Sequence, residues 1–132
     1  MRSAFAIVVA GAILVSCTAE VQVSEPVQIS WDELNEMVEA FGYEQGIRRF
    51  CEDPTATSQD VFLAELETIA GLDADLLTRA KVRAGEVQAE FDQADPAEEQ
   101  EYVCTVEMFV GSETRADGAR QRWADIKGAG ND

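Results

Sequence analysis

Apolar residues from position 30 onward recur three and four positions apart, the spacing that gathers side chains on one face of a helix. Few stretches alternate apolar and polar residues as a half-buried strand does, and the sequence lacks the turn signals of hairpins. The pattern predicts an all-α domain over residues 30–127, a small bundle of four to five helices. The connections between these helices are short, which favours antiparallel neighbours.

The first helix is predicted to begin at Ser30, because Ser30 and Glu33 have the spacing of a capping box. Its apolar face comprises Trp31, Leu34, Val38 and Phe41. A glycine weakens a helix by about 1 kcal/mol relative to alanine, so we expect a kink or short break near Gly42. Pro54 is expected to end this element just after Cys51.

The second helix is expected from about Ser58 to Ala70, with Gly71 as the left-handed residue that follows it. It buries Phe62, Leu66 and Ile69. The third helix has the clearest apolar stripe in the chain, made of Leu76, Leu77, Ala80, Ala84, Val87 and Phe91.

The fourth helix is expected to begin at Asp95 and Pro96, which supply a cap and a proline at the first helical position. It is expected to bury Tyr102, Val103, Val106 and Phe109 or Val110 before Gly111. A weaker last helix over residues 119–126 would bring together Ala119, Trp123 and Ile126. Residues 128–132 are expected to form a frayed tail.

The chain begins with one arginine and an apolar run over residues 4–15, which is shorter than the roughly 20 residues that span a bilayer. This is typical of the hydrophobic part of a signal peptide. The run ends in Leu14-Val15-Ser16-Cys17, which resembles the lipobox of bacterial lipoproteins. The resemblance implies that residues 1–16 are removed and that Cys17, carrying a palmitate-containing lipid, becomes the mature amino terminus.

Residues 17–29 would then form the lipidated cysteine and a short extended tether. Among lipoproteins of this class, an aspartate after the cysteine commonly retains the protein at the inner membrane. Thr18 stands there, so the resemblance favours the outer membrane, with the domain on the periplasmic side. The alternatives are an ordinary signal peptide cut after Ala19 and an uncleaved anchor.

Removal or lipidation of Cys17 leaves Cys51 and Cys104 in an oxidising compartment, where disulfides persist. We expect these two cysteines to pair, closing a loop of 54 residues. A loop of that length stabilises a domain by roughly 4 kcal/mol in the chain-entropy account. The alternative is two independent buried thiols. Two cysteines without a histidine do not make a usual structural zinc site, so no metal or other cofactor is expected.

The 132 residues allow one domain, and they carry 26 acidic and 10 basic side chains for a net charge of −16. Such a charge repels phosphate backbones, so nucleic acid is not expected as a partner. The chain has no histidine, and its serines and threonines have no evident activating base. We therefore predict no catalytic residues, and we interpret acidic pairs such as Asp73 with Asp75 as a solvated surface rather than a calcium site.

The one contrast in charge lies near the end of the chain, where four bases fall within thirteen residues: Arg115, Arg120, Arg122 and Lys127. Trp123 lies among them, and arginine and tryptophan are enriched at binding hot spots. These residues could dock an acidic partner or the protein's own acidic helices. In the other interpretation Trp123 caps the core of the bundle and the arginines pair with neighbouring acids.

The sequence thus favours a non-enzymatic envelope lipoprotein whose helical domain binds another envelope protein. A second interpretation is a stress chaperone, because the chain resembles the periplasmic acid-stress chaperones, which are small, soluble, helical proteins with one disulfide. The likeness lies in Cys51-Glu52-Asp53, in Cys104 about fifty residues later, and in the ending Trp123-Ala-Asp-Ile126-Lys127. A small inhibitor of lysozyme or a toxin-immunity protein would share the same compartment, size and disulfide.

Overall fold

The structure is a computed structural model that describes residues 27–131, with side chains described as far as Gly128. Cys17 and most of the predicted tether lie outside the described residues. The described part contains five helices and no strand: α2 (Trp31–Cys51), α3 (Ser58–Thr68), α4 (Ala74–Asp92), α5 (Pro96–Val103) and α6 (Val106–Asn131). The predicted all-α bundle is confirmed. Within residues 27–131, no helix combines the length and the apolar composition that crossing a bilayer requires.

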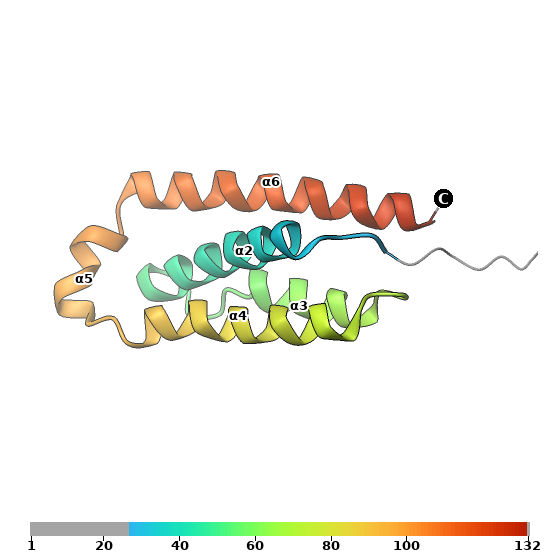
Figure 1. The fold of residues 1–132 in the computed structure, drawn as a ribbon. Coiled ribbons are helices and arrows are strands. Elements are labelled where there is room, and N and C mark those ends of the chain that lie inside the picture. The colour runs from blue at the N-terminus through green and yellow to red at the C-terminus, as the bar shows by residue number, and fades with distance from the viewer. Residues whose placement is uncertain (1–26, 132) are drawn as a thin grey trace, which may run out of the picture.

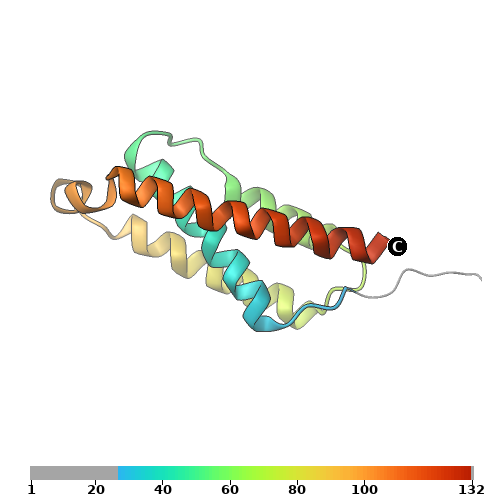
Figure 2. The ribbon, with the colours of Figure 1, turned by 90° about the horizontal axis from the view of Figure 1, so that it is seen from above.

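Helix α2 is the centre of the bundle and packs against each of the other helices. Figure 1 shows α6 on one side of α2 and the α3–α4 pair on the other. Successive long helices run antiparallel, and the short helix α5 lies at one end, between α4 and α6. Seen from above, α2 crosses beneath α6 (Figure 2). This arrangement buries α2 on most of its circumference, and its buried residues include polar ones.

The two ends of α2 lie where the sequence predicts them. The Ser30 hydroxyl accepts a hydrogen bond from the backbone N–H of Glu33 at 3.2 Å, and the helix ends at Cys51. The short break expected near Gly42 as the alternative to a kink is wrong, because α2 is one continuous helix.

Close packing explains both glycines of α2. A Cβ atom at Gly42 would lie 2.9 Å from Val87 Cγ1 and would collide with the side chain of Gln59. A Cβ atom at Gly46 would collide with the ring of Phe91. The glycines therefore let α3 and α4 approach the backbone of α2, and the packing gained offsets the weak helix propensity.

A buried glutamine of α2 caps the next helix. Thr57, the residue before α3, makes no side-chain cap. Instead, Gln45 Oε1 accepts hydrogen bonds from the backbone N–H groups of Gln59 at 2.8 Å and Asp60 at 3.0 Å. Because the first N–H groups of a helix have no partner within it, Gln45 supplies what a local cap would otherwise provide.

Two more glutamines extend this network to α4. Gln59 Nε2 donates to the backbone carbonyl of Val38 at 3.0 Å. Gln88 Nε2, from α4, donates to Gln59 Oε1 at 3.0 Å and to the carbonyl of Gly42 at 3.1 Å. The glutamine network, defined as Gln45, Gln59 and Gln88, therefore joins α2, α3 and α4.

Helices α3 and α4 bury most of the positions that the sequence predicts. Phe62 and Leu66 of α3 and Ala80, Ala84 and Val87 of α4 are buried. The other predicted positions are half-buried: Ile69, Leu76, Leu77 and Phe91. Helix α3 ends at Thr68, two residues before the predicted end, and Gly71 has a φ of 84° in the following turn. Only glycine adopts that left-handed conformation without strain.

The predicted fourth helix is two helices. It starts as expected, with Asp95 accepting from the backbone of Ala97, but α5 ends at Val103. A new helix, α6, follows, with Thr105 Oγ1 accepting from the backbone N–H of Met108 at 3.1 Å. The predicted burial of Tyr102 and Val106 is wrong, because both are exposed. Val103 is half-buried, and of the two alternatives Phe109 is half-buried while Val110 is exposed.

Helix α6 is also longer than the predicted last helix, because it continues through Gly111 to Asn131. It therefore includes most of the segment expected to fray. Ala119, Trp123 and Ile126 are buried together, as predicted.

The disulfide between Cys51 and Cys104 is confirmed, with Cα atoms 5.5 Å apart. It joins the end of α2 to the residue that follows α5. Helix α5 buries none of its residues, so the disulfide is the covalent link that holds this end of the bundle together.

We predict that Gly42→Ala destabilises the domain by about 1–3 kcal/mol, because the new methyl group overpacks the contact with Gln59 and Val87. The matched control is Gly85→Ala on the exposed side of α4, where an added Cβ meets nothing within 4 Å. That control should stabilise the domain by up to about 1 kcal/mol through helix propensity. Urea unfolding measures both changes. Stabilisation by Gly42→Ala would contradict the close-approach account.

Candidate functional site

Helix α6 faces α2 with an apolar seam of Ala116, Ala119, Trp123 and Ile126, spaced by three and four residues. The basic residues flank this seam, as charged residues flank the core of a coiled coil. Arg115 and Arg122 lie seven residues apart, as do Arg120 and Lys127. Each of the four pairs with a carboxylate of another helix.

Arg115 forms the densest of these contacts. Its guanidinium donates two hydrogen bonds of 2.8 Å to Glu36 and one of 3.1 Å to Glu39. Arg83 of α4 donates to the same Glu39 carboxylate at 2.8 Å, so Glu39 bridges α4 and α6 through α2.

These contacts shift the affinity of the groups for protons. The hydrogen bond from Arg115 lowers the pKa of Glu36 and raises that of Arg115. Burial alone would raise the pKa of Glu39, but the hydrogen bonds from Arg83 and Arg115 outweigh it and the pKa is lowered.

The other two arginines also pair with α2. Arg120 binds Glu44 with a shortest separation of 3.0 Å, and the Glu44 residue is only 3% exposed. Arg122 binds Glu33. The structure therefore places Arg115, Arg120 and Arg122 against the protein's own acidic helix.

Trp123 belongs to the core. Its ring packs edge-on against Phe62 with centroids 5.1 Å apart, and Phe62 lies 4.9 Å from Phe41. The indole N–H donates to Glu65 Oε1 at 2.7 Å, and Lys127 Nζ donates to the same oxygen at 3.0 Å. The hydrogen bond from Trp123, followed by that from Lys127, lowers the pKa of Glu65.

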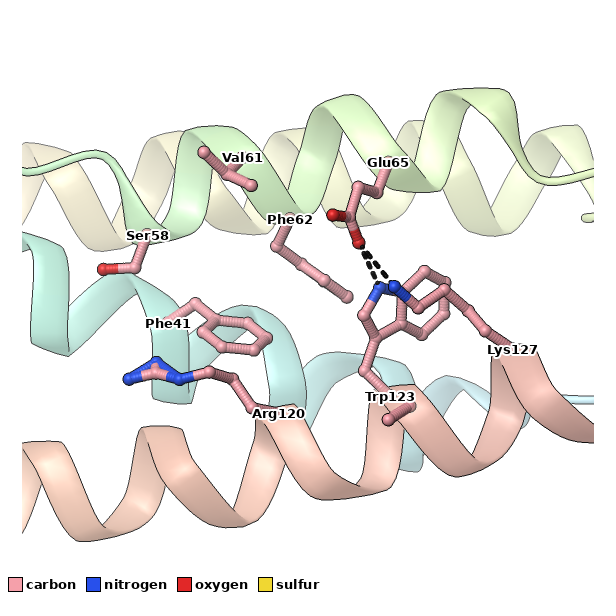
Figure 3. A pocket seen from close by; sticks show the side chains of 9 residues that line it. Phe41, Ser58, Val61, Phe62, Glu65, Arg120, Trp123 and Lys127 are labelled. Carbon is pink, nitrogen blue, oxygen red and sulfur yellow. Dashed lines mark hydrogen bonds and ion pairs between the residues drawn. The ribbon is translucent and has the colours of Figure 1, made fainter.

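A pocket of about 360 Å³ opens between α3 and α6, with α2 behind it in the view of Figure 3. Figure 3 shows its side chains, with the rings of Phe41, Phe62 and Trp123 lying between the two helices. We call it the α3–α6 pocket, and its lining comprises Phe41, Ser58, Val61, Phe62, Glu65, Arg120, Trp123, Ala124 and Lys127.

The α3–α6 pocket combines apolar walls with charged groups. Two cations lie over its aromatic rings, Arg120 at 5.7 Å from the centroid of Phe41 and Lys127 at 5.6 Å from that of Trp123. Its volume falls in the range of ligand-binding pockets, roughly 300–1,000 Å³. Such a pocket suits an apolar group that enters from outside. In the described part of the chain, no three His, Cys, Asp or Glu side chains are grouped so that they could hold a metal ion.

The sequence anticipates only part of this site. Arg120 and Trp123 line the pocket, whereas Arg115 and Arg122 lie outside it, and Cys17 lies outside the described residues. Val61 and Glu65 were missed, because each reads as an ordinary residue of an amphipathic helix. The spacing of apolar positions within α3 and within α6 does not show that a pocket remains between these two helices.

We predict that the domain loses stability in acid through the carboxylates that hold α6. The pKa values of Glu36, Glu39 and Glu65 lie below the ordinary value of 4.5, so their stabilising contribution is complete above about pH 4.5. It is lost as the pH falls through the lowered values. Urea unfolding followed by tryptophan fluorescence between pH 7 and pH 3 measures this.

The variant Glu36→Gln should flatten that pH dependence, because it removes one of the titrating partners of Arg115. Glu98→Gln on exposed α5, which forms no ion pair within residues 27–131, is the control and should leave the profile unchanged. Equal profiles for the two variants would contradict this role for Glu36.

Comparisons with known proteins identify no relative of this chain. No family model matches it, and no curated protein or solved structure is similar at a significant level.

Proposed function

We propose that this chain is a non-enzymatic lipoprotein of the cell envelope whose helical domain binds another envelope protein. The leader supports the anchor, because the apolar run ends in Leu14-Val15-Ser16-Cys17. In this proposal lipid on Cys17 holds the domain at the membrane, on the periplasmic side of the outer membrane. Incorporation of labelled palmitate into the native chain, and its loss in Cys17→Ser, tests the anchor.

The observation that carries the binding role is the α3–α6 pocket. Its three aromatic rings form apolar walls between two helices, while Glu65, Arg120 and Lys127 supply charges around them. Binding energy at protein interfaces concentrates where an apolar side chain fills a pocket and polar groups around it exclude water. We propose that an aromatic or branched apolar side chain of the partner occupies this pocket.

The chemistry of the pocket favours binding over catalysis. Glu65 is its only carboxylate, and the hydrogen bonds from Trp123 and Lys127 keep its pKa low. A carboxylate with a lowered pKa is ionised at neutral pH and is a weak base, so it neither donates nor removes protons effectively. The Glu65 carboxylate instead accepts hydrogen bonds from Trp123 and Lys127 and holds both side chains at the wall of the pocket.

A second candidate is an acid-stress chaperone, and the pairing of α2 with α6 favours it. The arginines that flank the α6 seam depend on carboxylates of α2, which acid would neutralise. Release of α6 would expose Phe41, Phe62 and Trp123, and exposed apolar surface is what a protein that holds unfolded clients needs.

The chaperone role predicts that the mature chain binds an apolar dye and prevents aggregation of a client protein at pH 2–3, but not at pH 7. A chain that loosens in acid without protecting any client would contradict the chaperone role. The binding role would be unaffected by that result.

We predict that a photo-crosslinking residue at Val61, placed in the full chain in native cells, gives a discrete adduct with one partner. Val61 lines the pocket and is 51% exposed, so a crosslinking side chain there lies within reach of a partner side chain in the pocket. Val82, 58% exposed on α4, is the matched control and should give no adduct. Ala124→Trp fills the pocket from α6 and should abolish the adduct at Val61. Equal adducts from Val61 and Val82, or no adduct from either, would contradict the proposal.

A further inference from the structure

The connection between α5 and α6 carries a second exposed apolar surface. We call it the elbow surface and define it as Tyr102, Val106 and Val110, whose exposed fractions are 73%, 77% and 55%. With Met108, which is 41% exposed, four of the six large exposed apolar residues of the described part fall within nine positions. Val106 and Val110 lie four residues apart and therefore share one face of α6, whereas Met108 lies two residues from each and projects from another face.

This surface is held in place although it is exposed among the described residues 27–131. Cys104, in the middle of the elbow, is bonded to Cys51 at the end of α2. Helix α5 buries none of its eight residues, so its side chains are free to meet another molecule. The elbow lies at one end of the bundle, opposite the start of α2 and the end of α6 (Figures 1 and 2).

The charge around the elbow has one sign. Residues 84–114 contain nine acidic side chains and no lysine or arginine. Four exposed glutamates adjoin the elbow surface and form no ion pair among residues 27–131: Glu98, Glu99, Glu101 and Glu107.

The bases of the described part do not pair with these four glutamates. Every lysine and arginine there except Arg79 forms an ion pair with another carboxylate, and Arg79 lies over the ring of Trp31. The elbow therefore combines exposed apolar side chains with glutamates that have no ion-pair partner among residues 27–131.

We propose that the elbow surface binds a cationic amphipathic segment of a partner polypeptide, one that presents lysine or arginine beside apolar side chains. The apolar residues of the partner would cover Val106 and Val110, and its cations would meet the surrounding glutamates. A second copy of this chain carries the same acidic rim and would be repelled, as would anionic lipid headgroups. This proposal is independent of the α3–α6 pocket, because the α6 residues that line the pocket begin at Arg120, ten positions after Val110.

The test uses the whole mature chain from residue 17 with Cys17→Ser, which removes lipid and the need for detergent. The probe is a short amphipathic peptide of leucine and lysine, and an all-lysine peptide of equal charge is its comparison. We expect the leucine–lysine peptide to bind more tightly than the all-lysine peptide, because the elbow offers apolar as well as acidic contacts. Equal affinity of the two peptides would reduce the interaction to net charge and overturn the proposal.

Paired variants locate the binding. The double variant Glu99→Gln and Glu107→Gln should weaken binding of the leucine–lysine peptide about fivefold or more. Asp32→Asn with Asp125→Asn has the same net charge but alters elements at the other end of the bundle, and it should leave the affinity unchanged. If both double variants weaken peptide binding equally, the peptide is attracted to the overall charge of the chain and not to the elbow, and the proposal is overturned.

Variants that replace an exposed valine by serine test the apolar part of the proposed contact. Val106→Ser should weaken binding to a similar extent, and Val82→Ser, at a comparably exposed valine of α4, should not. Fluorine-labelled tyrosine should report the peptide at Tyr102 and not at Tyr43, which bonds to Glu90. Two other results would overturn the proposal. If the chain forms a dimer that Val106→Ser abolishes, the surface binds a second copy. If the chain binds anionic vesicles and Val106→Ser abolishes that binding, the surface binds lipid.

The pocket variant separates this proposal from the proposed function. Ala124→Trp fills the α3–α6 pocket and leaves the elbow unchanged, so it should retain peptide binding. Loss of peptide binding in Ala124→Trp would place the peptide in the pocket and contradict the elbow site.

Discussion

Burial of α2 among the other helices is the constraint on which the rest of the structure depends. A helix surrounded on most sides has no solvent to satisfy its polar side chains, and an unpaired polar group in such a place costs about 1–3 kcal/mol. Gln45 and Gln59 meet this constraint by bonding to backbone groups of neighbouring helices. The same bonds fix the beginning of α3 against α2, so satisfying the polar groups also sets the geometry of packing. Gly42 completes the arrangement, because only a residue without a side chain allows Gln59 and Val87 so close.

Charge determines a different part of the architecture. The chain has 26 acidic side chains for 10 basic ones, and the bases of α6 are used where that helix meets its neighbours. Exposed ion pairs contribute only about 0–1 kcal/mol each, so the apolar seam around Trp123 supplies most of the attraction between α6 and α2. The ion pairs set the register of α6 and make its attachment sensitive to acid. Because the bases of α6 are engaged there, the glutamates of α5 and Glu107 of α6 have no ion-pair partner among residues 27–131, and the elbow has a single sign of charge.

The sequence predicts the elements whose signals are local. The helix start at Ser30, the proline after Asp95 and the apolar stripe of α4 each depend on residues within one helix. The two helix starts are confirmed, and the centre of the stripe is buried. The errors concern contacts between helices. Gly42 reads as a helix breaker until the approach of α3 is known, and the break at Cys104 interrupts a stretch whose apolar spacing continues into α6. Thr105 caps α6 without a glutamate or glutamine three residues later, so the usual capping box is missing there.

The residues of the candidate site also divide into those recognisable from the sequence and those that depend on packing between helices. Arg120 and Trp123 could be selected from the sequence because bases are rare in this chain, whereas Val61 and Glu65 acquire their positions from the packing of α3 beside α6. The pairing of Cys51 with Cys104 was predictable because the expected lipidation or removal of Cys17 leaves two cysteines, which have a single connectivity. The exposure of Tyr102 and Val106 was not, since periodicity identifies an apolar face but not whether another helix covers it.

Native-state hydrogen exchange tests the central role of α2 most directly, because it measures the free energy of opening for each helix separately. If burial of α2 organises the bundle, amides over residues 38–47 exchange only when the whole domain unfolds, while those of α5 exchange through smaller openings. Exchange of the α2 amides at a lower free energy than those of α4 would contradict this account.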